Sequence, residues 1–443
     1  MGKARIIGVA AALAVAAGLA ATPLLAEASS SSGSQASPST TAAPAATRVL
    51  DDDVHLNQIQ VTGSHNSYHI LPPAKEVALR HTFIGDGDKL MEYRHAPLPQ
   101  QFESQKVRQI ELDLFLDPTG GKYANPLLRS VAGDGAYDPV MNQPGIKVLH
   151  VQDVDYASTC LTFKACLTQV KQWSDANPTH APIAILLELK DDDVPFSGFD
   201  FVHPDPFNAA AMNTVDAEIR SVLPPSDLIT PDDVRGSHAT LQEAVTTDGW
   251  PTLGESRGKI MFLMDNGGDK RTAYLAGHPN LEGRAVFTNA PAGAPDAAFV
   301  EHNEASDVAV IQDLVQQGYV VRTRADGDTT EARENDTSDR DDAYRSGAQW
   351  VSTDYPVPGW AIGFTSPYYS EIPGGTVARC NPVNAPPSCV SAQIDTIYHP
   401  VTTPPPSTTS TTTSTLPPAT VPDDDVDPAT GAQPVSGAAS YTG

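Results

Sequence analysis

The 443-residue sequence has few cysteines and few basic residues, and each shortage limits what the chain can be. Its four cysteines lack the C-x-x-C spacing of a zinc site, and neither close pair stands beside clustered histidines. The 28 lysines and arginines are outnumbered by 54 acidic residues, which gives a formal charge of −26. Because a nucleic-acid ligand requires a basic protein face, this composition argues against a nucleic-acid partner.

Beyond its N-terminus, the sequence lacks an apolar run long enough to span a membrane. The one long apolar run, residues 6–20, follows Lys3 and Arg5 and is succeeded by small residues that suit a cleavage site. This pattern predicts a secretory signal peptide over residues 1–28, in preference to a membrane anchor. The protein is therefore expected to be secreted and extracellular.

Large apolar side chains are nearly absent from two further segments. Residues 29–49 are mostly Ser, Ala, Thr and Pro, and residues 401–443 are mostly Thr, Pro, Ser and Asp. Such segments cannot bury enough surface to offset the entropy of ordering, so both are predicted to be disordered. The sequence leaves open whether the second segment tethers the protein to a cell surface. The remaining residues, 50–400, suit one domain with a small C-terminal extension.

The cysteines fall into two close pairs within residues 50–400. In an exported chain, close pairs are expected to form local disulfides. The predicted bonds join Cys160 to Cys166 and Cys380 to Cys389, the second within the C-terminal extension.

Short β-branched or apolar runs alternate with segments of helical periodicity along residues 50–400. Eight such runs alternating with helices fit a (β/α)8 barrel, possibly in distorted form, and equally a doubly wound sheet. The predicted strands are Gln58–Ser64, Gln109–Leu116, Val148–Val151, Ile183–Lys190, Lys259–Asp265, Ala285–Thr288, Tyr319–Arg324 and Trp350–Asp354. The predicted helices are Thr162–Ala176, Ala209–Val222, Ala305–Gln317 and Glu331–Arg345.

The ends of these runs favour the barrel. Barrel enzymes place functional groups at the C-terminal ends of several strands, whereas doubly wound sheets gather them at one or two crossovers. No glycine-rich phosphate loop stands at a strand–helix junction. We therefore predict an α/β fold with a TIM-barrel-like architecture. The polar residues near the ends of the runs are His65, Glu111, Asp113, His150, Glu188, Asp265 and Asp354.

Carboxylates on two predicted strands suggest a cation site. Glu111 and Asp113 alternate with apolar residues and would face the same side of a strand. Most such triplets face solvent, but a buried pair would need a metal or other cations. Glu188 ends an uninterrupted apolar run, which is typical of a strand covered on both faces. Lys190, two residues further on, would either pair with Glu188 or contact an anionic substrate.

His65 and His150 each close a predicted strand and would serve as general acid or base. Asn66, next to His65, offers a neutral oxygen that suits a calcium shell better than a zinc site. The chain has 12 histidines. Ordinary roles are expected for His55, His69, His81, His95, His180 and His278.

Four motifs, taken in order, resemble the catalytic domain of calcium-dependent phosphoinositide-specific phospholipase C, especially its bacterial secreted branch. They are Ser64-His65-Asn66-Ser67-Tyr68, Ile110-Glu111-Leu112-Asp113, Val148-Leu149-His150 and Leu187-Glu188-Leu189-Lys190. The resemblance covers residues 55–190 and continues through residues 319–326 and 347–355.

The resemblance implies a role for each matching residue. It makes His65 and His150 the catalytic histidines. It implies substrate contacts, to the phosphate or headgroup, for Lys190, Arg322 and Arg324. It implies that Ca2+ is the cofactor, held by Asn66, Glu111, Asp113 and Glu188.

The implied activity is that of a phosphoric diester hydrolase. In the family, the inositol 2-hydroxyl attacks phosphorus and diacylglycerol leaves, giving a cyclic inositol phosphate that is open to further hydrolysis. Calcium would lower the pKa of the hydroxyl and offset charge on the phosphoryl oxygens. The expected partner is a phospholipid or phosphodiester at a membrane surface. No protein partner is predicted, and the chain is expected to be a monomer.

Two regions of the sequence depart from the family pattern. Residues 66–108 include a long insertion, and residues 191–208 are rich in Asp, Pro and Phe, so the mouth of the barrel is expected to differ from the family pattern.

A glycerophosphodiester phosphodiesterase, or a phospholipase for another headgroup, is the first alternative function. The former opens on His-Arg-Gly, where this chain has His65-Asn66-Ser67. A non-catalytic surface or binding protein is the second alternative, disfavoured because the whole residue set is present.

Overall fold

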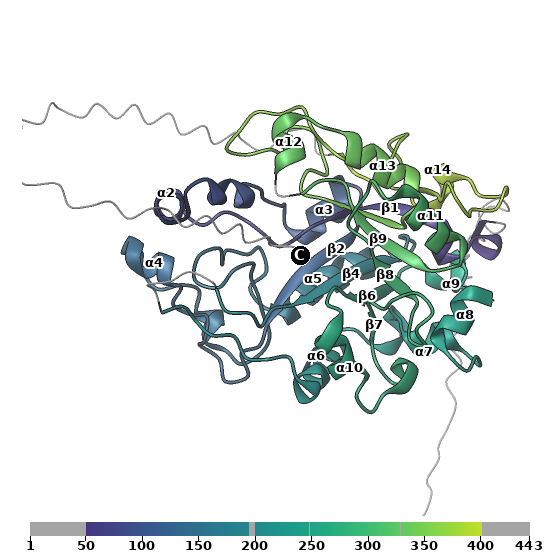
Figure 1. Ribbon diagram of the computed structural model, residues 1–443, viewed down its shortest axis with the longest axis horizontal. Helices are drawn as coiled ribbons and strands as arrows, with labels where there is room; N and C mark the ends of the chain where they lie inside the picture. The colour runs from purple at the N-terminus through teal and green to yellow at the C-terminus, as the bar shows by residue number, and fades with distance from the viewer. Residues whose placement is uncertain (1–49, 195–199, 248, 328, 401–443) are drawn as a thin grey trace, which may run out of the picture. The chain divides into compact units, whose positions relative to one another are not determined.

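The computed structural model describes residues 50–194, 200–247, 249–327 and 329–400 (Figure 1). The predicted signal peptide, the segment 29–49 and the tail 401–443 lie outside the described residues. Among the described helices, none is both long and apolar enough to cross a membrane.

Parallel strands form the centre of the fold. From β1 (Ile59–Ser64), the sheet continues on one side through β2 (Val107–Phe115), β4 (Ile183–Leu189) and β6 (Ile260–Met264) to β7 (Val286–Thr288). On the other side it continues through β10 (Trp350–Thr353) and β9 (Val320–Arg324) to β8 (Phe299–Glu301). A parallel bridge between Asn289 and Phe299 joins the two ends. The predicted TIM-barrel-like α/β fold is confirmed, in a distorted form.

Three short strands lie off this path. β5 (Leu228–Ile229) runs parallel to β6, while β11 (Ala378–Cys380) is antiparallel to β1 and β3 (Lys147–Val148) is antiparallel to β2. The prediction of a barrel strand at Val148–Val151 is therefore wrong, and the remaining parallel strand of the barrel is β8, which pairs with β9. Leu149 packs in a side cluster with Phe115 and Met141, so the local apolar pattern reports burial outside the barrel.

Helices lie between the strands and around them (Figure 1). Two of them match the prediction closely: α5 (Phe163–Ala176) and α6 (Ala209–Val222). The predicted helix Glu331–Arg345 is wrong, because the chain turns at Asn335 (φ 53°) and divides it into α12 (Thr330–Glu334) and α13 (Ser338–Ser346). The other helices are α2 (Ala74–Ile84), α3 (Leu98–Ser104), α4 (Leu127–Ala132), α7 (Pro231–Arg235), α8 (Leu241–Thr247), α9 (Leu253–Ser256), α10 (Gly268–Leu275), α11 (Val308–Gln316) and α14 (Ser391–Ile394).

Side-chain caps begin the two longest helices. The Thr162 side chain accepts a hydrogen bond from the backbone N–H of Ala165 at the start of α5. The Asn208 side chain accepts bonds from the N–H groups of Ala210 and Ala211 at the start of α6. These caps satisfy N–H groups that have no partner inside the helix, each contributing about 1 kcal/mol.

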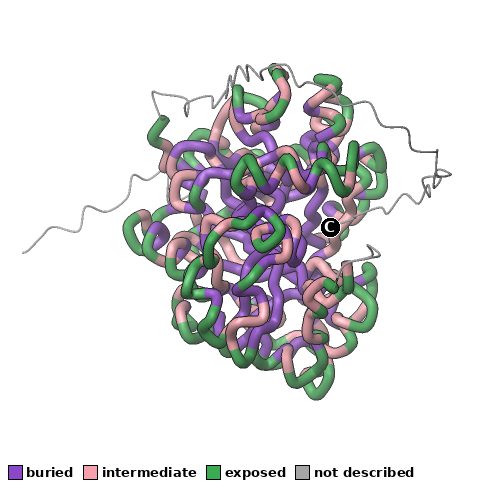
Figure 2. The backbone as a smooth tube through the Cα atoms, turned by 90° about the vertical axis from the view of Figure 1, so that its left-hand side faces the viewer, coloured by how far each residue is buried: buried purple, intermediate pink, exposed green. Residues whose placement is uncertain are grey.

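The core surrounds β2 and β4, whose residues are all buried. Figure 2 shows this buried backbone running through the centre, with exposed segments around it. The apolar side chains of Leu186 and Leu187 are no more than 1% exposed, so their truncation to Ala would cost about 2–5 kcal/mol each. A rigid centre of this kind holds the polar residues at the strand ends in fixed positions.

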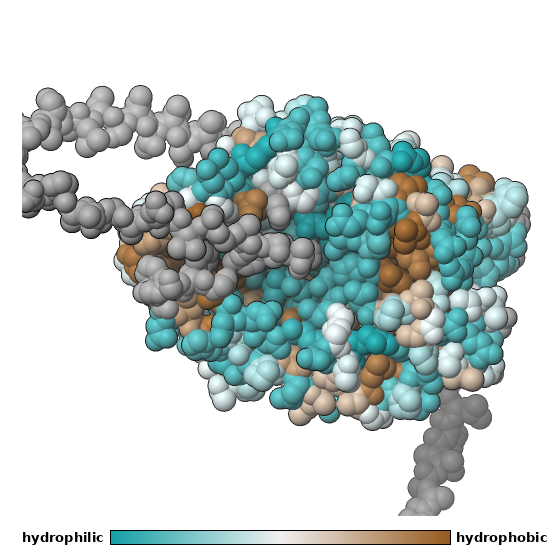
Figure 3. Space-filling view, viewed as in Figure 1, coloured by the Kyte–Doolittle hydropathy of each residue, from teal (hydrophilic) through white to brown (hydrophobic). Residues whose placement is uncertain are grey.

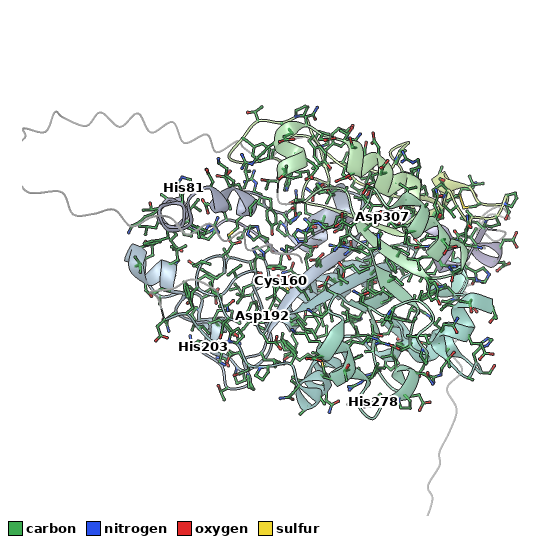
Figure 4. The ribbon with its side chains drawn as sticks, in the orientation of Figure 1. His81, Cys160, Asp192, His203, His278 and Asp307 are labelled. Atoms are coloured by element: carbon green, nitrogen blue, oxygen red, sulfur yellow. A yellow bond between two sulfur atoms is a disulfide. The ribbon has the colours of Figure 1, made fainter. Side chains whose placement is uncertain are left out.

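Strand pairing and a buried ion pair both tie the C-terminal extension to the barrel. β11 pairs with β1, and Arg108 on β2 makes a buried ion pair with Asp395 at 2.7 Å. Both predicted disulfides are present. Cys160–Cys166 joins the segment before α5 to the first turn of that helix, and Cys380–Cys389 lies within the extension. The side-chain view labels Cys160 on the central part of the fold (Figure 4).

Candidate active site

Three carboxylates meet at the ends of two neighbouring strands. Glu111 and Asp113 lie on β2, and Glu188 lies on β4, in register with Asp113. All three side chains are buried, and one oxygen of each lies within 4.8 Å of the others. The alternation of apolar and acidic residues on β2 thus places both acidic side chains beside that of the next strand.

Several oxygens of these carboxylates accept no hydrogen bond, and this donor set fits a hard cation. Within the described residues, neither oxygen of Asp113 accepts a hydrogen bond, and neither does Oε1 of Glu111. Burial raises the pKa of Asp113 well above its usual range and that of Glu111 to about 7. Because burying an uncompensated carboxylate is costly, the trio requires positive charge. Clustered carboxylate oxygens are the ligand type that Ca2+ prefers.

Tyr68 links Asn66 to the surroundings of these carboxylates. The chain turns directly after β1, with Asn66 in the left-handed region (φ 43°) that Asn tolerates better than most residues. Its side-chain oxygen lies 3.4 Å from the hydroxyl of Tyr68, and its amide donates to the hydroxyl of Tyr93 at 2.8 Å. Burial, and then the charge of Asp113, raise the pKa of Tyr68. Asn66 therefore offers one neutral oxygen, which Tyr68 links to the surroundings of Asp113.

Two basic residues lie directly against the carboxylates. Lys190 Nζ is 2.6 Å from Oε2 of Glu188 and 3.3 Å from Oδ2 of Asp113. Arg322 Nη2 is 2.5 Å from Oε2 of Glu111, while its Nη1 is 2.7 Å from Oε1 of Glu301. The sequence left two roles open for Lys190, pairing with Glu188 or contact with an anionic substrate. In the structure it is paired with Glu188.

His65 is held between acidic and basic groups. Its Nδ1 lies 3.0 Å from Oδ1 of Asp354, which follows β10, and its Nε2 lies 3.7 Å from Oε1 of Glu111. Arg324 Nη2 is 3.3 Å from the same Nδ1. Burial and the charge of Arg324 lower the pKa of His65 well below its ordinary value, although Asp354 acts in the opposite direction. The ring is therefore neutral at neutral pH.

His150 is backed by a buried carboxylate. Its Nδ1 lies 2.7 Å from Oδ2 of Asp155, and His69 Nε2 lies 2.8 Å from the same oxygen. Arg80 forms ion pairs with both Asp155 and Asp88. Burial lowers the pKa of His150 below its ordinary value, although the hydrogen bond to Asp155 acts in the opposite direction. The charges of His69 and Arg80 hold the pKa of Asp155 well below its usual range, so this group stays ionised.

The position of His150 differs from the predicted one. It lies in a loop closed by the antiparallel bridge between Val151 and Asp155, and no barrel strand ends there. Its ring is 5.6 Å from that of His69 and 6.4 Å from that of Tyr93, which also stacks on His69. The loop begins directly after β3, which pairs with β2, and buried side chains hold it from there onward.

Several residues of this site carry no signal in the sequence that assigns them a role. Asp354 stands at the polar end of a predicted strand, but no motif includes it with a function. Asp155 and Tyr93 follow no strand and had no signal beyond residue type. His69 was expected to have an ordinary role, yet it contacts the partner of His150.

The insertion in residues 66–108 supplies part of this network. α2 carries Arg80, and the 3-10 helix Gly85–Met91 carries Asp88. Figure 4 labels His81, the next residue on α2, on the arm of the molecule that these two helices form. The insertion thus contacts Asp155, the buried carboxylate that pairs with His150.

Comparison with known proteins identifies a family. The family model for "Phosphoinositide phospholipase C, Ca2+-dependent" matches residues 54–382. No curated protein matches the chain.

Solved structures of the same description are similar to the chain. A calcium-dependent phosphoinositol-specific phospholipase C from a Gram-negative Pseudomonas species is 17% identical, with a TM-score of 0.46, over 75% of this chain and 96% of that one. A Ca2+-dependent phosphatidylinositol-specific phospholipase C from Streptomyces antibioticus is 19% identical, with a TM-score of 0.43, over 68% of this chain and 95% of that one.

Proposed function

The chain belongs to the calcium-dependent phosphoinositide phospholipase C family, and we propose that it is a secreted enzyme that cleaves phosphatidylinositol-type lipids. It is a phosphoric diester hydrolase with Ca2+ as its cofactor. The products would be diacylglycerol and a cyclic inositol phosphate. The observation that carries this proposal is a buried carboxylate trio beside two histidines, each paired with its own aspartate.

His65 would act as the general base. Its neutral ring takes the proton of the inositol 2-hydroxyl as the oxygen of that hydroxyl bonds to phosphorus. The 3.0 Å contact of Nδ1 with Asp354 orients the ring and stabilises the positive charge that develops on it. Arg324 and the burial of the ring lower its pKa, which keeps the base unprotonated before the reaction.

His150 would act as the general acid. It gives a proton to the diacylglycerol oxygen as the bond from that oxygen to phosphorus breaks. Burial lowers the pKa of His150, but Asp155, which is kept ionised by its partners, stabilises the ring in its protonated form. The side chain of His150 is 15% exposed, so it remains accessible to solvent. The proton taken by His65 and the one given by His150 balance over the step.

Asn66, Glu111, Asp113 and Glu188 would hold the calcium ion. Bound there, calcium would lower the pKa of the attacking hydroxyl and offset charge on the phosphoryl oxygens. This set adjoins the proposed base, because Glu111 Oε1 is 3.7 Å from His65 Nε2. A cation at this position also explains how a chain of charge −26 would accept an anionic lipid.

Lys190, Arg322 and Arg324 remain our candidates for contacts to the phosphate or headgroup. All three lie in the site, within ion-pair distance of Glu188, Glu111 and Asp354 respectively. Arg324 is the best placed for the reacting phosphate, because it lies beside the base.

Exposed apolar residues support approach to a lipid surface. Phe83 on α2 is 52% exposed and Val131 on α4 is 49% exposed, and these two helices contact one another. In the space-filling view, apolar residues appear at the left edge of the molecule, where α2 and α4 lie in Figure 1 (Figure 3). α2 also carries Arg80, which forms an ion pair with Asp155, the partner of His150. The exposed apolar residues therefore lie on an element that also contributes to the site.

Secretion is supported by the two disulfides. Such bonds persist in oxidising compartments and are rare in the cytosol. Together with the predicted signal peptide, they favour an extracellular enzyme.

Product analysis tests this proposed function. Purified protein is incubated with phosphatidylinositol vesicles, or with glycerophosphodiesters, with and without a calcium chelator. Phosphorus NMR follows the products. We expect a cyclic inositol phosphate from phosphatidylinositol and loss of activity in chelator. Activity on glycerophosphodiesters alone would replace the proposal with the first alternative, and full activity in excess chelator would remove calcium from the mechanism.

A further inference from the structure

We propose that Lys190 is a built-in counter-ion of the calcium site, whose ammonium group neutralises Asp113 and Glu188 until calcium displaces it. This inference rests on the proposed function in one respect, because it takes these carboxylates as calcium ligands. It adds that the chain sets its own calcium affinity through a competing side chain.

The position of the ammonium group is the first argument. Lys190 Nζ lies 2.6 Å from Oε2 of Glu188 and 3.3 Å from Oδ2 of Asp113. Both ion pairs that Lys190 makes with described residues are therefore to proposed calcium ligands. Calcium binds six to eight oxygens at 2.3–2.6 Å, so it would require the same carboxylates. Two cations on one carboxylate pair repel each other, so binding of calcium opposes the contact of the lysine.

The neighbouring arginine behaves differently. Arg322 contacts Glu111 but also Glu301 at 2.7 Å and the side chain of Asn303 at 2.6 Å. It therefore keeps two partners when Glu111 turns to a metal. Lys190 has no second partner of this kind among the described residues, so it is the cation that must move.

The backbone and the exposure of Lys190 allow that movement. Its backbone N–H donates to the carbonyl of Leu114 at 2.9 Å, which holds the main chain between β2 and β4. Its side chain is 23% exposed, so the ammonium group can move toward solvent without disturbing the sheet. The long flexible stem of lysine suits such an exchange.

Two consequences follow for the protein without calcium. The ammonium group stabilises the calcium-free fold, since it compensates carboxylates that would otherwise be buried together. It also weakens calcium binding, because the ion must displace it and apparent affinity falls with the fraction of competent sites. Removing the ammonium group should therefore change stability and affinity in opposite directions.

The test compares Lys190→Met with Lys270→Met. Lys270 makes an ion pair with Asp191 at 2.7 Å and is 19% exposed, so its replacement removes the same charge from a similar environment without touching the trio. Calcium binding is measured by titration calorimetry, and unfolding of the chelator-treated proteins by thermal denaturation. We expect Lys190→Met to bind calcium about tenfold more tightly and to melt at a lower temperature without calcium. Lys270→Met should bind calcium within about twofold of wild type.

Each other outcome has a definite meaning. Unchanged or weaker calcium binding by Lys190→Met overturns the inference and leaves the proposed function intact. Failure of the wild-type protein to bind calcium overturns the ligand assignment itself. If Lys190→Met does not fold, Lys190→Gln keeps the length and polarity of the side chain and is measured in its place. In the wild-type protein, NMR of lysine ammonium groups should also show one signal, absent from Lys190→Gln, that changes on calcium addition; an unperturbed signal contradicts the inference.

Discussion

His65 Nδ1 lies 3.0 Å from Oδ1 of Asp354, so the ends of β1 and β10 supply one histidine–aspartate pair although 289 residues separate the two positions. The adjacent parallel strands β1 and β10 create this contact, because Ser64 is in register with Thr353. A second such pair, His150 with Asp155, lies within one loop. The two pairs have the same chemistry but different structural support, and this difference leads to distinct predictions.

Replacing Asp354 with Asn should lower kcat by about a hundredfold or more, with a smaller effect on KM. The amide cannot stabilise a protonated His65, although it preserves the size of the side chain. Kinetics on phosphatidylinositol vesicles measure the effect. Asp307→Asn is the matched control, since it alters the exposed pair of His302 and Asp307 (3.0 Å) and should leave kcat unchanged. Wild-type kcat in Asp354→Asn would exclude this aspartate from the mechanism.

Replacing Asp155 with Asn should reduce both activity and stability. The carboxylate compensates buried Arg80, and it accepts hydrogen bonds from His69 and His150. Breaking a buried ion pair of this kind costs about 3–5 kcal/mol. Denaturant unfolding and kinetics measure the two effects. His150→Ala serves for comparison: it should lose at least about a hundredfold in kcat while keeping most of its stability. An Asp155→Asn protein as stable as wild type would contradict the buried network.

Replacing Asp113 with Asn should abolish the stabilisation of the protein by calcium. In chelator, the variant should be at least as stable as wild type, because the raised pKa of Asp113 reflects an unfavourable buried charge. Added calcium should then raise the melting temperature of wild type but not of Asp113→Asn. Asp192→Asn, an exposed carboxylate in the loop after β4, should respond to calcium as wild type does; Figure 4 labels its position. An equal calcium response in Asp113→Asn would remove this residue from the ligand set.

His180 should make the fold sensitive to acid. Burial lowers its pKa to about 4 in the folded state, from about 6.5 in the unfolded chain. Between these values the unfolded chain binds the additional proton, so stability is complete above about pH 6.5 and falls as the pH decreases toward 4, by at most about 1.4 kcal/mol per pH unit. Urea unfolding across this range should show a shallower pH dependence for His180→Gln. His81→Gln, at an exposed position, should follow wild type. Parallel curves for His180→Gln and wild type would contradict the assignment.

The sequence allowed much of the fold to be predicted, because burial on strand faces leaves a local pattern. The apolar runs at β2 and β4 and the helical periodicity of α5 and α6 carry that pattern, and the resemblance drawn from the motifs is confirmed by the family match. β8 was missed because its three residues are too short to show a period. The segment at His150 was mistaken for a strand because a buried loop shows the same short apolar run.

By itself, the sequence determined which residue types stand at the strand ends and in which order, since those follow from local alternation and motif spacing. Only the tertiary structure decided which groups touch. It paired His65 with Asp354, closed the sheet through β8, brought Arg80 from an insertion to Asp155 and set Lys190 against Asp113 and Glu188. The physical reason is that contacts between strands and loops depend on register and packing across the whole barrel, which residues distant in the chain establish together.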